Sequence, residues 1–156
     1  MKNLVRFLTV AALLLFAMYA ADDVVSAAHG TITKLDSSTN TMVIKTKDGT
    51  EHTVHFVDKT AVWGADKTAA GAKDSFKGLS EGSEVVVHYS EKGGEKTATE
   101  VDKVGKDGLK YMDGTVTKVG KDGKTVVVKS ADKAGKTTVY YTEEGGKKVA
   151  HFFEKI

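Results

Sequence analysis

Short runs of alternating apolar and polar residues recur from about residue 30 to the end of the chain. In one of them Val85, Val87 and Tyr89 share a face. Val86 and His88 lie on the opposite face. A period of two is typical of half-buried strands, and Asp-Gly and Gly-Gly turns separate the runs. The pattern predicts an all-β protein. The expected strands are 30–36, 41–47, 51–58, 84–90, 96–104, 110–119, 124–130, 136–142 and 147–155.

The segment from Gly64 to Ser83 departs from this pattern. Ala69, Ala72 and Phe76 fall at i, i+3 and i+7, which would place them on one face of a short helix. Three strands, a helical plug and two further strands follow the order of an OB-type barrel. We therefore predict a five-stranded OB-like barrel with a short helical plug over residues 28–105.

The later part of the chain repeats the earlier part at two offsets. Each pair of segments keeps the order of its apolar and turn residues, which marks a structural unit. The matching segments are 30–35 with 114–119, 41–46 with 125–130, 87–94 with 139–146, and 102–104 with 154–156. The second copy lacks the plug and the third strand. Residues 106–156 are therefore expected to form a smaller antiparallel β-meander, a truncated repeat packed on the first unit.

Several short motifs carry a resemblance to a known class of protein. Gly30-Thr31-Ile32, Met42-Val43-Ile44, Asp58-Lys59-Thr60-Ala61-Val62 and Val85-Val86-Val87 follow its spacing. On these motifs, residues 30–104 resemble the small exported bacterial OB-like β-barrel domains of uncharacterised envelope proteins. The resemblance implies the fold and a binding or structural role.

A related comparison is with the small periplasmic copper-binding OB proteins, which use a His, two closely spaced Met and a Trp. The side chains available here for such a site are Met42, His52, His55 and Trp63. The paired-Met motif is missing, and this departure speaks against a copper-chaperone role.

The N-terminal segment is typical of a secretory signal peptide. Lys2 and Arg6 precede an apolar run from Phe7 to Tyr19, and Val25-Ser26-Ala27 offers small residues before a cut. We expect residues 1–27 to be removed, with Ala28 or His29 as the new N-terminus. The protein would then be periplasmic or secreted, without a membrane span after cleavage. An uncleaved membrane anchor is the alternative. Cysteine is absent, which excludes a lipobox and thiolate metal ligands.

The charged residues of the mature chain indicate which classes of partner it would bind. Arg6, inside the expected signal peptide, is the only arginine, and the mature chain carries 21 lysines and 19 acidic residues interspersed along it. Specific nucleic-acid recognition relies on the arginine fork. We therefore expect no nucleic-acid partner. An unknown envelope component or a small ligand is expected instead.

Three histidines are candidate metal ligands: His29, His55 and His88. His29 would become the N-terminal residue if cleavage followed Ala28, and its amine and imidazole would together chelate copper. His55 and His88 lie on outward-facing registers and would be neighbours across strands. Two imidazoles without a third ligand make a weak site, so solvent-exposed histidines are the alternative.

Trp63 is the candidate ligand platform, since OB folds bind sugars and single strands on aromatic side chains near such loops. The alternative is that Trp63 packs into the bottom of the barrel.

The sequence offers no arrangement of nucleophile, acid and base, and no catalytic residue or cofactor is expected. We therefore predict an exported, non-enzymatic binding or structural module of the cell envelope. A periplasmic copper- or metal-binding protein is one alternative. A carbohydrate- or peptidoglycan-associated module is another.

Overall fold

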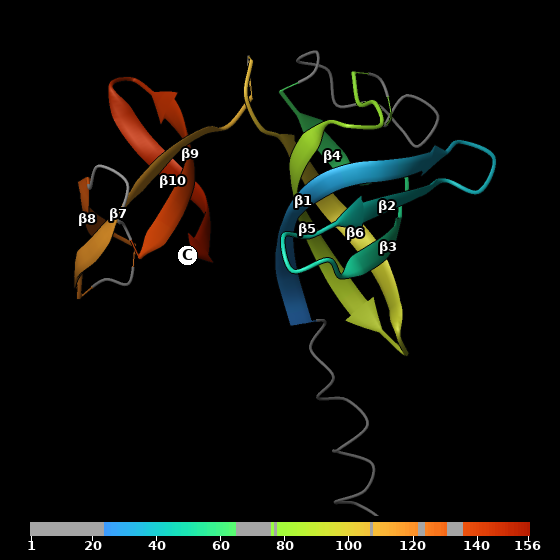
Figure 1. Ribbon diagram of the computed structural model, residues 1–156, viewed down its shortest axis with the longest axis horizontal. Helices are drawn as coiled ribbons and strands as arrows, with labels where there is room; N and C mark the ends of the chain where they lie inside the picture. Colours follow the sequence, from blue (N-terminus) through green and yellow to red (C-terminus); the bar gives the residue numbers. More distant parts are fainter. Residues whose placement is uncertain (1–23, 65–75, 77, 107, 122–123, 131–135) are drawn as a thin grey trace, which may run out of the picture.

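The computed structural model describes residues 24–64, 76, 78–106, 108–121, 124–130 and 136–156. These residues form strands and turns, with no helix among them, and the predicted all-β class is confirmed. Figure 1 shows a barrel, blue to yellow, beside a smaller sheet, orange to red. The described residues include no helix of the length and apolar character needed to cross a bilayer. The strands are β1 (Val24–Asp36), β2 (Thr41–Lys45), β3 (Glu51–His55), β4 (Ala61–Trp63), β5 (Glu84–Lys92), β6 (Glu95–Lys103), β7 (Lys110–Val119), β8 (Val126–Ser130), β9 (Thr137–Glu144) and β10 (Lys147–Lys155).

The first six strands form the predicted OB-like barrel. The sheet order is β3-β2-β1-β5-β6-β4, and a parallel pairing of His55 in β3 with Thr97 in β6 closes it. The predicted strand 51–58 ends at His55, and the short strand β4 then continues along β6. Thr60 makes this step, because its buried hydroxyl donates to the carbonyl of Ala98 at 2.7 Å and accepts from the amide of Val57.

Alternation fills the barrel interior as predicted. Val85, Val87 and Tyr89 of β5 are buried in one core with Val54 and Phe56. The predicted helical plug falls largely on residues 65–75 and 77, which lie outside the described residues. Phe76 and Leu79, which flank that segment, pack on the same core, and the rings of Phe76 and Phe56 lie 4.7 Å apart.

The last four strands form the second sheet, which is antiparallel throughout as expected. Its order is β10-β9-β7-β8, so β9 pairs with β7 and not with β8 as in a simple meander. Read from its other edge, the order β8-β7-β9-β10 matches the order β2-β1-β5-β6 in the barrel. Strand β7 therefore lies between two partners, as β1 does.

Local irregularities recur at matching places in the two sheets. The β1–β2 register shifts between Ile32 and Lys34, and the β7–β8 register shifts between Val116 and Lys118. At each shift a threonine hydroxyl donates across the strands, from Thr33 to Val43 at 3.3 Å and from Thr117 to Val127 at 3.2 Å.

Gly30 and Gly114 lie at matching positions in the two sheets, where the neighbouring strand leaves no room for a side chain. A Cβ on Gly30 would lie 2.6 Å from the carbonyl oxygen of Lys45, and one on Gly114 would lie 2.7 Å from that of Lys129. Any side chain at either position would force the paired strands apart. The sequence match between residues 30–35 and 114–119 therefore includes a glycine that the strand pairing needs.

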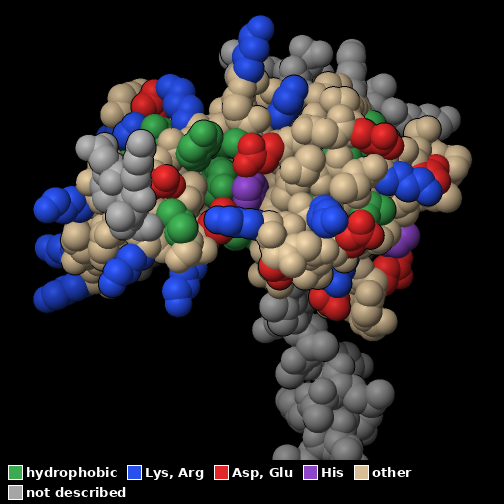
Figure 2. Space-filling model, viewed as in Figure 1, with side chains coloured by type: hydrophobic (Ala, Val, Ile, Leu, Met, Phe, Trp, Pro, Cys, Tyr) green, Lys and Arg blue, Asp and Glu red, His purple; other side chains and the backbone are tan. Residues whose placement is uncertain are grey.

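The barrel and the second sheet meet at an apolar junction. Val86, on the outer face of β5, is fully buried there with Val104, Leu109 and Tyr140, and Phe152 packs against them. The link between the two bodies is short, and a bridge joins Val104 to Leu109. In Figure 2 hydrophobic, histidine and acidic side chains gather where the two bodies touch. The outer face of β5 is thus a second packing surface.

Candidate metal centre at the junction

Asp102 is a buried carboxylate without a hydrogen-bond partner. It lies on β6 next to Val101, which fills the barrel core, so strand alternation turns Asp102 outward to the junction. The residue is 1% exposed, and neither carboxylate oxygen has a hydrogen-bond partner among the described residues. An unsatisfied buried polar group costs about 1–3 kcal/mol, and more when charged. A buried, ionised carboxylate of this kind is stabilised by a nearby cation.

Three further side chains surround this carboxylate. His151 Nδ1 lies 3.5 Å from Asp102 Oδ2, and His88 Nε2 lies 3.7 Å from the same oxygen. Ligand atoms of Glu100, Asp102 and His151 all lie within 4.8 Å of one another. We refer to Asp102, Glu100, His88 and His151 as the Asp102 cluster. Its first three members belong to the barrel, whereas His151 belongs to the second sheet.

Two β-bulges position these side chains. The β5–β6 register pairs His88 with Glu100 and then Tyr89 with Ala98, so Thr99 is the extra residue, and its hydroxyl donates to the carbonyl of His88 at 3.0 Å. The β9–β10 register skips His151 in the same way. A bulge re-aims a side chain and is common near functional sites. Here it turns His151 towards the barrel.

The charges in the cluster influence one another. The pKa of His151 is raised, chiefly because its ring nitrogen faces the Asp102 carboxylate. Burial lowers the pKa of His88, although Asp102 acts in the opposite direction. Burial and then the Asp102 charge raise the pKa of Glu100. A divalent cation would favour the ionised carboxylates and neutral imidazoles together.

The spacing of the donor atoms suits a shared metal ion. Separations of 3.5 and 3.7 Å are long for a charge-assisted hydrogen bond, which spans about 2.7–2.9 Å. Two donors held tetrahedrally at about 2.0–2.2 Å from one Zn²⁺ are about 3.4 Å apart. Two imidazoles with one or two carboxylates form a donor set for Zn²⁺ or Cu²⁺.

Thr142 holds the His151 ring in a suitable orientation. Its hydroxyl lies 3.1 Å from His151 Nε2, on the side of the ring away from Asp102. When Nε2–H donates to this hydroxyl, Nδ1 is left unprotonated and directed at Asp102 as a ligand. Metal-binding histidines are commonly fixed by such a contact at the second nitrogen.

His29, a predicted ligand, lies in a different cluster at the junction. Its Nε2 is 2.7 Å from Glu84, its Nδ1 is 3.3 Å from Glu154, and its ring lies 4.6 Å from that of Tyr140. The Tyr140 hydroxyl donates to Glu154 at 3.0 Å, and burial raises the pKa of Tyr140. The His29 imidazole is thus already engaged with two carboxylates from the two bodies.

The position of His29 along β1 also bears on the expected cleavage. Strand β1 begins at Val24, and Val24–Ala27 pair with β5 up to His88. Cleavage after Ala27 would shorten this strand by those residues and leave His29 in its present pairing with Val86.

The structure separates His55 from His88, the pair expected to be neighbours. His55 Nε2 lies 3.8 Å from Glu95 on the exposed side of the barrel, whereas His88 faces Asp102 at the junction. His52, on the other face of β3, contacts the ring of Tyr89 at 6.2 Å. The opposite orientation of His52 and His55 follows from their odd spacing on one strand.

Trp63 does not pack into the barrel. Its side chain is 59% exposed at the end of β4, so the core alternative is wrong, and the ligand platform remains a prediction. Trp63 pairs in register with Asp102, and the two side chains therefore project from the same face of the barrel. The single tryptophan of the chain is thus one strand away from the centre of the cluster.

Sequence reasoning missed Asp102, Glu100 and His151 as site residues. Asp102 and Glu100 are two apart on a strand and share a face, which the alternation alone could have shown. The apolar Val86 on the outer face of β5 signalled that something covers this face. The position of His151 depends on a bulge, for which the sequence gives no signal.

Comparison with protein families and with curated proteins gave no match. Among solved structures the chain is similar to "Crystal structure of Ag(I)CusF", with 10% identity over 51% of this chain and 97% of that one, at a TM-score of 0.38. It is also similar to apo-CusF residues 6–88 from Escherichia coli, with 11% identity over 55% of this chain and 94% of that one, at a TM-score of 0.40.

Proposed function

We propose that this chain is a non-enzymatic binding module that holds a divalent transition-metal ion between its barrel and its second sheet. The observation that carries the proposal is the Asp102 carboxylate, 1% exposed and without a hydrogen bond, with two imidazoles and a second carboxylate around it. Burying a charge is costly unless it is paired or coordinates a metal. The burial of Asp102 also favours metal binding over catalysis, because a substrate could not reach a carboxylate that is 1% exposed.

Zn²⁺ and Cu²⁺ are the ions that suit these donors. Imidazole and carboxylate suit Zn²⁺ and Cu²⁺ better than Ca²⁺ or Mg²⁺, which take oxygen ligands. His88 and His151 each keep about a fifth of their side-chain surface exposed, at 21% and 23%, which leaves a path for the ion. Because His151 comes from β10, the bound ion would fasten the second sheet to the barrel.

Export supports this role. The signal-like residues 1–27 would send the protein to the periplasm or the medium. The site contains nitrogen and oxygen donors alone, so oxidation of thiols cannot inactivate it. Metal binding and not covalent cross-linking would then stabilise the junction of this exported chain.

Titration of the metal-free mature protein with CuSO₄ or ZnCl₂ tests the proposal. We expect one equivalent to bind, with a dissociation constant below 1 μM as an order of magnitude for a three- or four-ligand site. Cu²⁺ should quench the fluorescence of Trp63, because neighbouring strands lie about 4.8 Å apart. Asp102→Asn should weaken binding at least about tenfold, by analogy with the loss of a supporting ligand contact.

The matched control is His55→Gln, which removes an exposed imidazole outside the cluster. It should leave the stoichiometry and the affinity unchanged. Binding that survives Asp102→Asn and is lost in His55→Gln or His29→Gln would place the metal elsewhere and contradict the proposal.

A further inference from the structure

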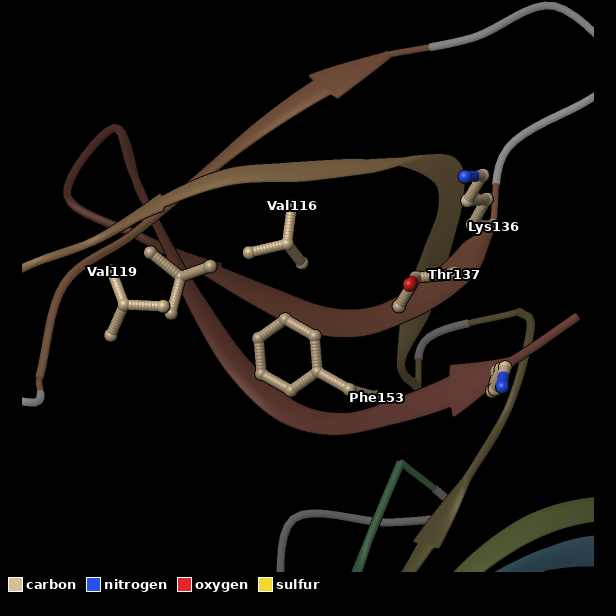
Figure 3. Close-up of a pocket in the computed structure, with 7 residues that line it drawn as sticks. Val116, Val119, Lys136, Thr137 and Phe153 are labelled. Atoms are coloured by element: carbon tan, nitrogen blue, oxygen red, sulfur yellow. The ribbon is translucent and has the colours of Figure 1, made fainter.

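The second sheet carries an open apolar groove on the face opposite to the one that packs on the barrel, since Phe153 lines the groove and its neighbour Phe152 lies at the junction. The groove has a volume of about 480 Å³ and is lined by Val116, Val119, Val126 and Phe153, with Lys136 and Lys155 at its border. Figure 3 shows Val116, Val119 and Phe153 side by side on this face. Val119 is 59% exposed and Phe153 is 40% exposed, which is unusual for large apolar side chains gathered in one place.

Strand pairing shows what this groove corresponds to in the barrel. Gly114 pairs with Thr137 as Gly30 pairs with Val85, and Val119 pairs with Val126 as Leu35 pairs with Met42. Phe153 pairs with Val139 as Val101 pairs with Val87. The groove positions are therefore those of the barrel interior. In the barrel Ile32, Met42, Val85 and Val101 are all buried at these positions.

The barrel also shows what normally covers this face. Strand β3 pairs antiparallel with β2, and its Val54, with Phe56 directly after the strand, closes the core from that side. In the second sheet β8 takes the place of β2 and stands at the edge, with no strand paired to its outer side among the described residues. An exposed strand edge beside an apolar groove is a template for an added strand.

The charge around the groove favours an acidic polypeptide over a second copy of the sheet as its occupant. Residues 106–156 carry eleven lysines and seven acidic residues, and the charged side chains that line the groove are the two lysines. A second copy of the sheet would bring like charges together. An acidic segment would meet complementary charge.

We propose that the second sheet binds an extended polypeptide segment that pairs antiparallel with β8 and places apolar side chains of alternate residues into the groove, with acidic residues between or beside them. This inference goes beyond the metal site and does not depend on it. Main-chain hydrogen bonds to Val126–Ser130 would supply affinity, and the groove would select the alternate apolar residues. The bound segment would complete the second sheet as β3 completes the barrel.

The chain's own third strand supplies a probe. A fluorescent peptide with the sequence of residues 50–58, Thr-Glu-His-Thr-Val-His-Phe-Val-Asp, has the required alternation and two acidic residues. We expect saturable binding of this peptide to the full mature protein by fluorescence anisotropy. A peptide in which the positions of Val54 and Phe56 are serine should bind at least tenfold more weakly.

Two variants of the protein locate the binding surface. Val119→Lys places a charge in the groove at an exposed position and should weaken peptide binding at least tenfold. Val127→Lys changes an exposed valine on the opposite face of β8 and should leave binding within twofold. Both variants should keep the wild-type circular dichroism.

Three results would overturn the proposal. The first is an absence of peptide binding, and the second is binding that Val119→Lys leaves intact. The third is a stable dimer in sedimentation that Val119→Lys dissociates, because it would assign the groove to a second copy of the chain. A failure of the metal titration alone would affect the junction and leave this inference standing.

Discussion

At the residue scale, the site depends on side chains that fix one another's direction. Asp102 lies in the junction because Val101 beside it fills the barrel core. His151 reaches Asp102 from a bulge, and Thr142 contacts its second nitrogen at 3.1 Å. A ligand oriented in this way loses less freedom when the metal binds.

Thr142→Val therefore tests whether this orientation matters. The valine keeps the size of the side chain but removes the hydroxyl that holds His151 Nε2. We expect copper affinity to fall about 10- to 100-fold, the range typical for loss of an outer contact to a metal ligand. Quenching of Trp63 fluorescence in a titration gives the dissociation constant.

Thr138→Val is the matched control, since Thr138 also lies on β9 and donates to Asp113, away from the cluster. It should leave the affinity unchanged. Equal weakening by the two substitutions would show that the effect comes from a general loosening of β9.

At the scale of elements, the second sheet is held partly by a surface ion-pair group. The Glu143 carboxylate on β9 contacts Lys110 of β7 at 2.5 Å and Lys148 of β10 at 2.9 Å. These contacts lower the pKa of Glu143 from an ordinary 4.5 to about 2. One carboxylate thus bridges three strands.

This arrangement predicts how the stability of the sheet depends on pH. Because the pKa of Glu143 is lower in the folded state, its contribution is present above about pH 4.5 and is lost as the pH falls towards 2. The difference in unfolding free energy between wild type and Glu143→Gln should therefore shrink over this range. Denaturant unfolding at several pH values measures it.

Glu51→Gln, which changes an exposed carboxylate on β3, is the comparison for this experiment. It should leave most of the acid dependence of the wild type in place. A constant difference between wild type and Glu143→Gln at all pH values would mean that the lysine contacts do not persist in solution.

The elements themselves could be predicted well from sequence, and the reason is alternation. Alternation predicts that Val85, Val87 and Tyr89 share one face, and the three are buried together. Strand β4 was missed because three residues show no periodicity. The order of β7, β8 and β9 was also missed, since local patterns fix strands but not which edges pair.

The site could be predicted only in part, because it is made by the contact of two bodies. His88 was a candidate from sequence and lies in the cluster, whereas His29 and His55 lie elsewhere. In the sequence, Asp102 looks like one of the polar residues on the solvent face of β6, and only the second sheet buries it. A buried charge of this kind is visible only once the junction is known.

At the scale of the whole molecule, the two bodies meet through contacts that cross from each to the other. Asp102 of the barrel faces His151 of the second sheet, and Glu154 of the second sheet faces His29 of the barrel. Apolar residues such as Val86 and Tyr140 fill the space between these groups. A metal at Asp102 would therefore act on the attachment of the second sheet as a whole.

The most direct measurement of the central claim is the thermal stability of wild type and Asp102→Asn, each with and without Zn²⁺. Without metal, Asp102→Asn should be at least as stable as wild type, because it removes a buried charge that lacks a hydrogen bond. Zn²⁺ at about 100 times the wild-type dissociation constant should stabilise wild type by about 2.7 kcal/mol and the variant by about 1.4 kcal/mol or less. If Asp102→Asn is instead less stable without metal, and Zn²⁺ shifts neither protein, then Asp102 serves only as an ion-pair partner of His151 and the metal-centre account is wrong.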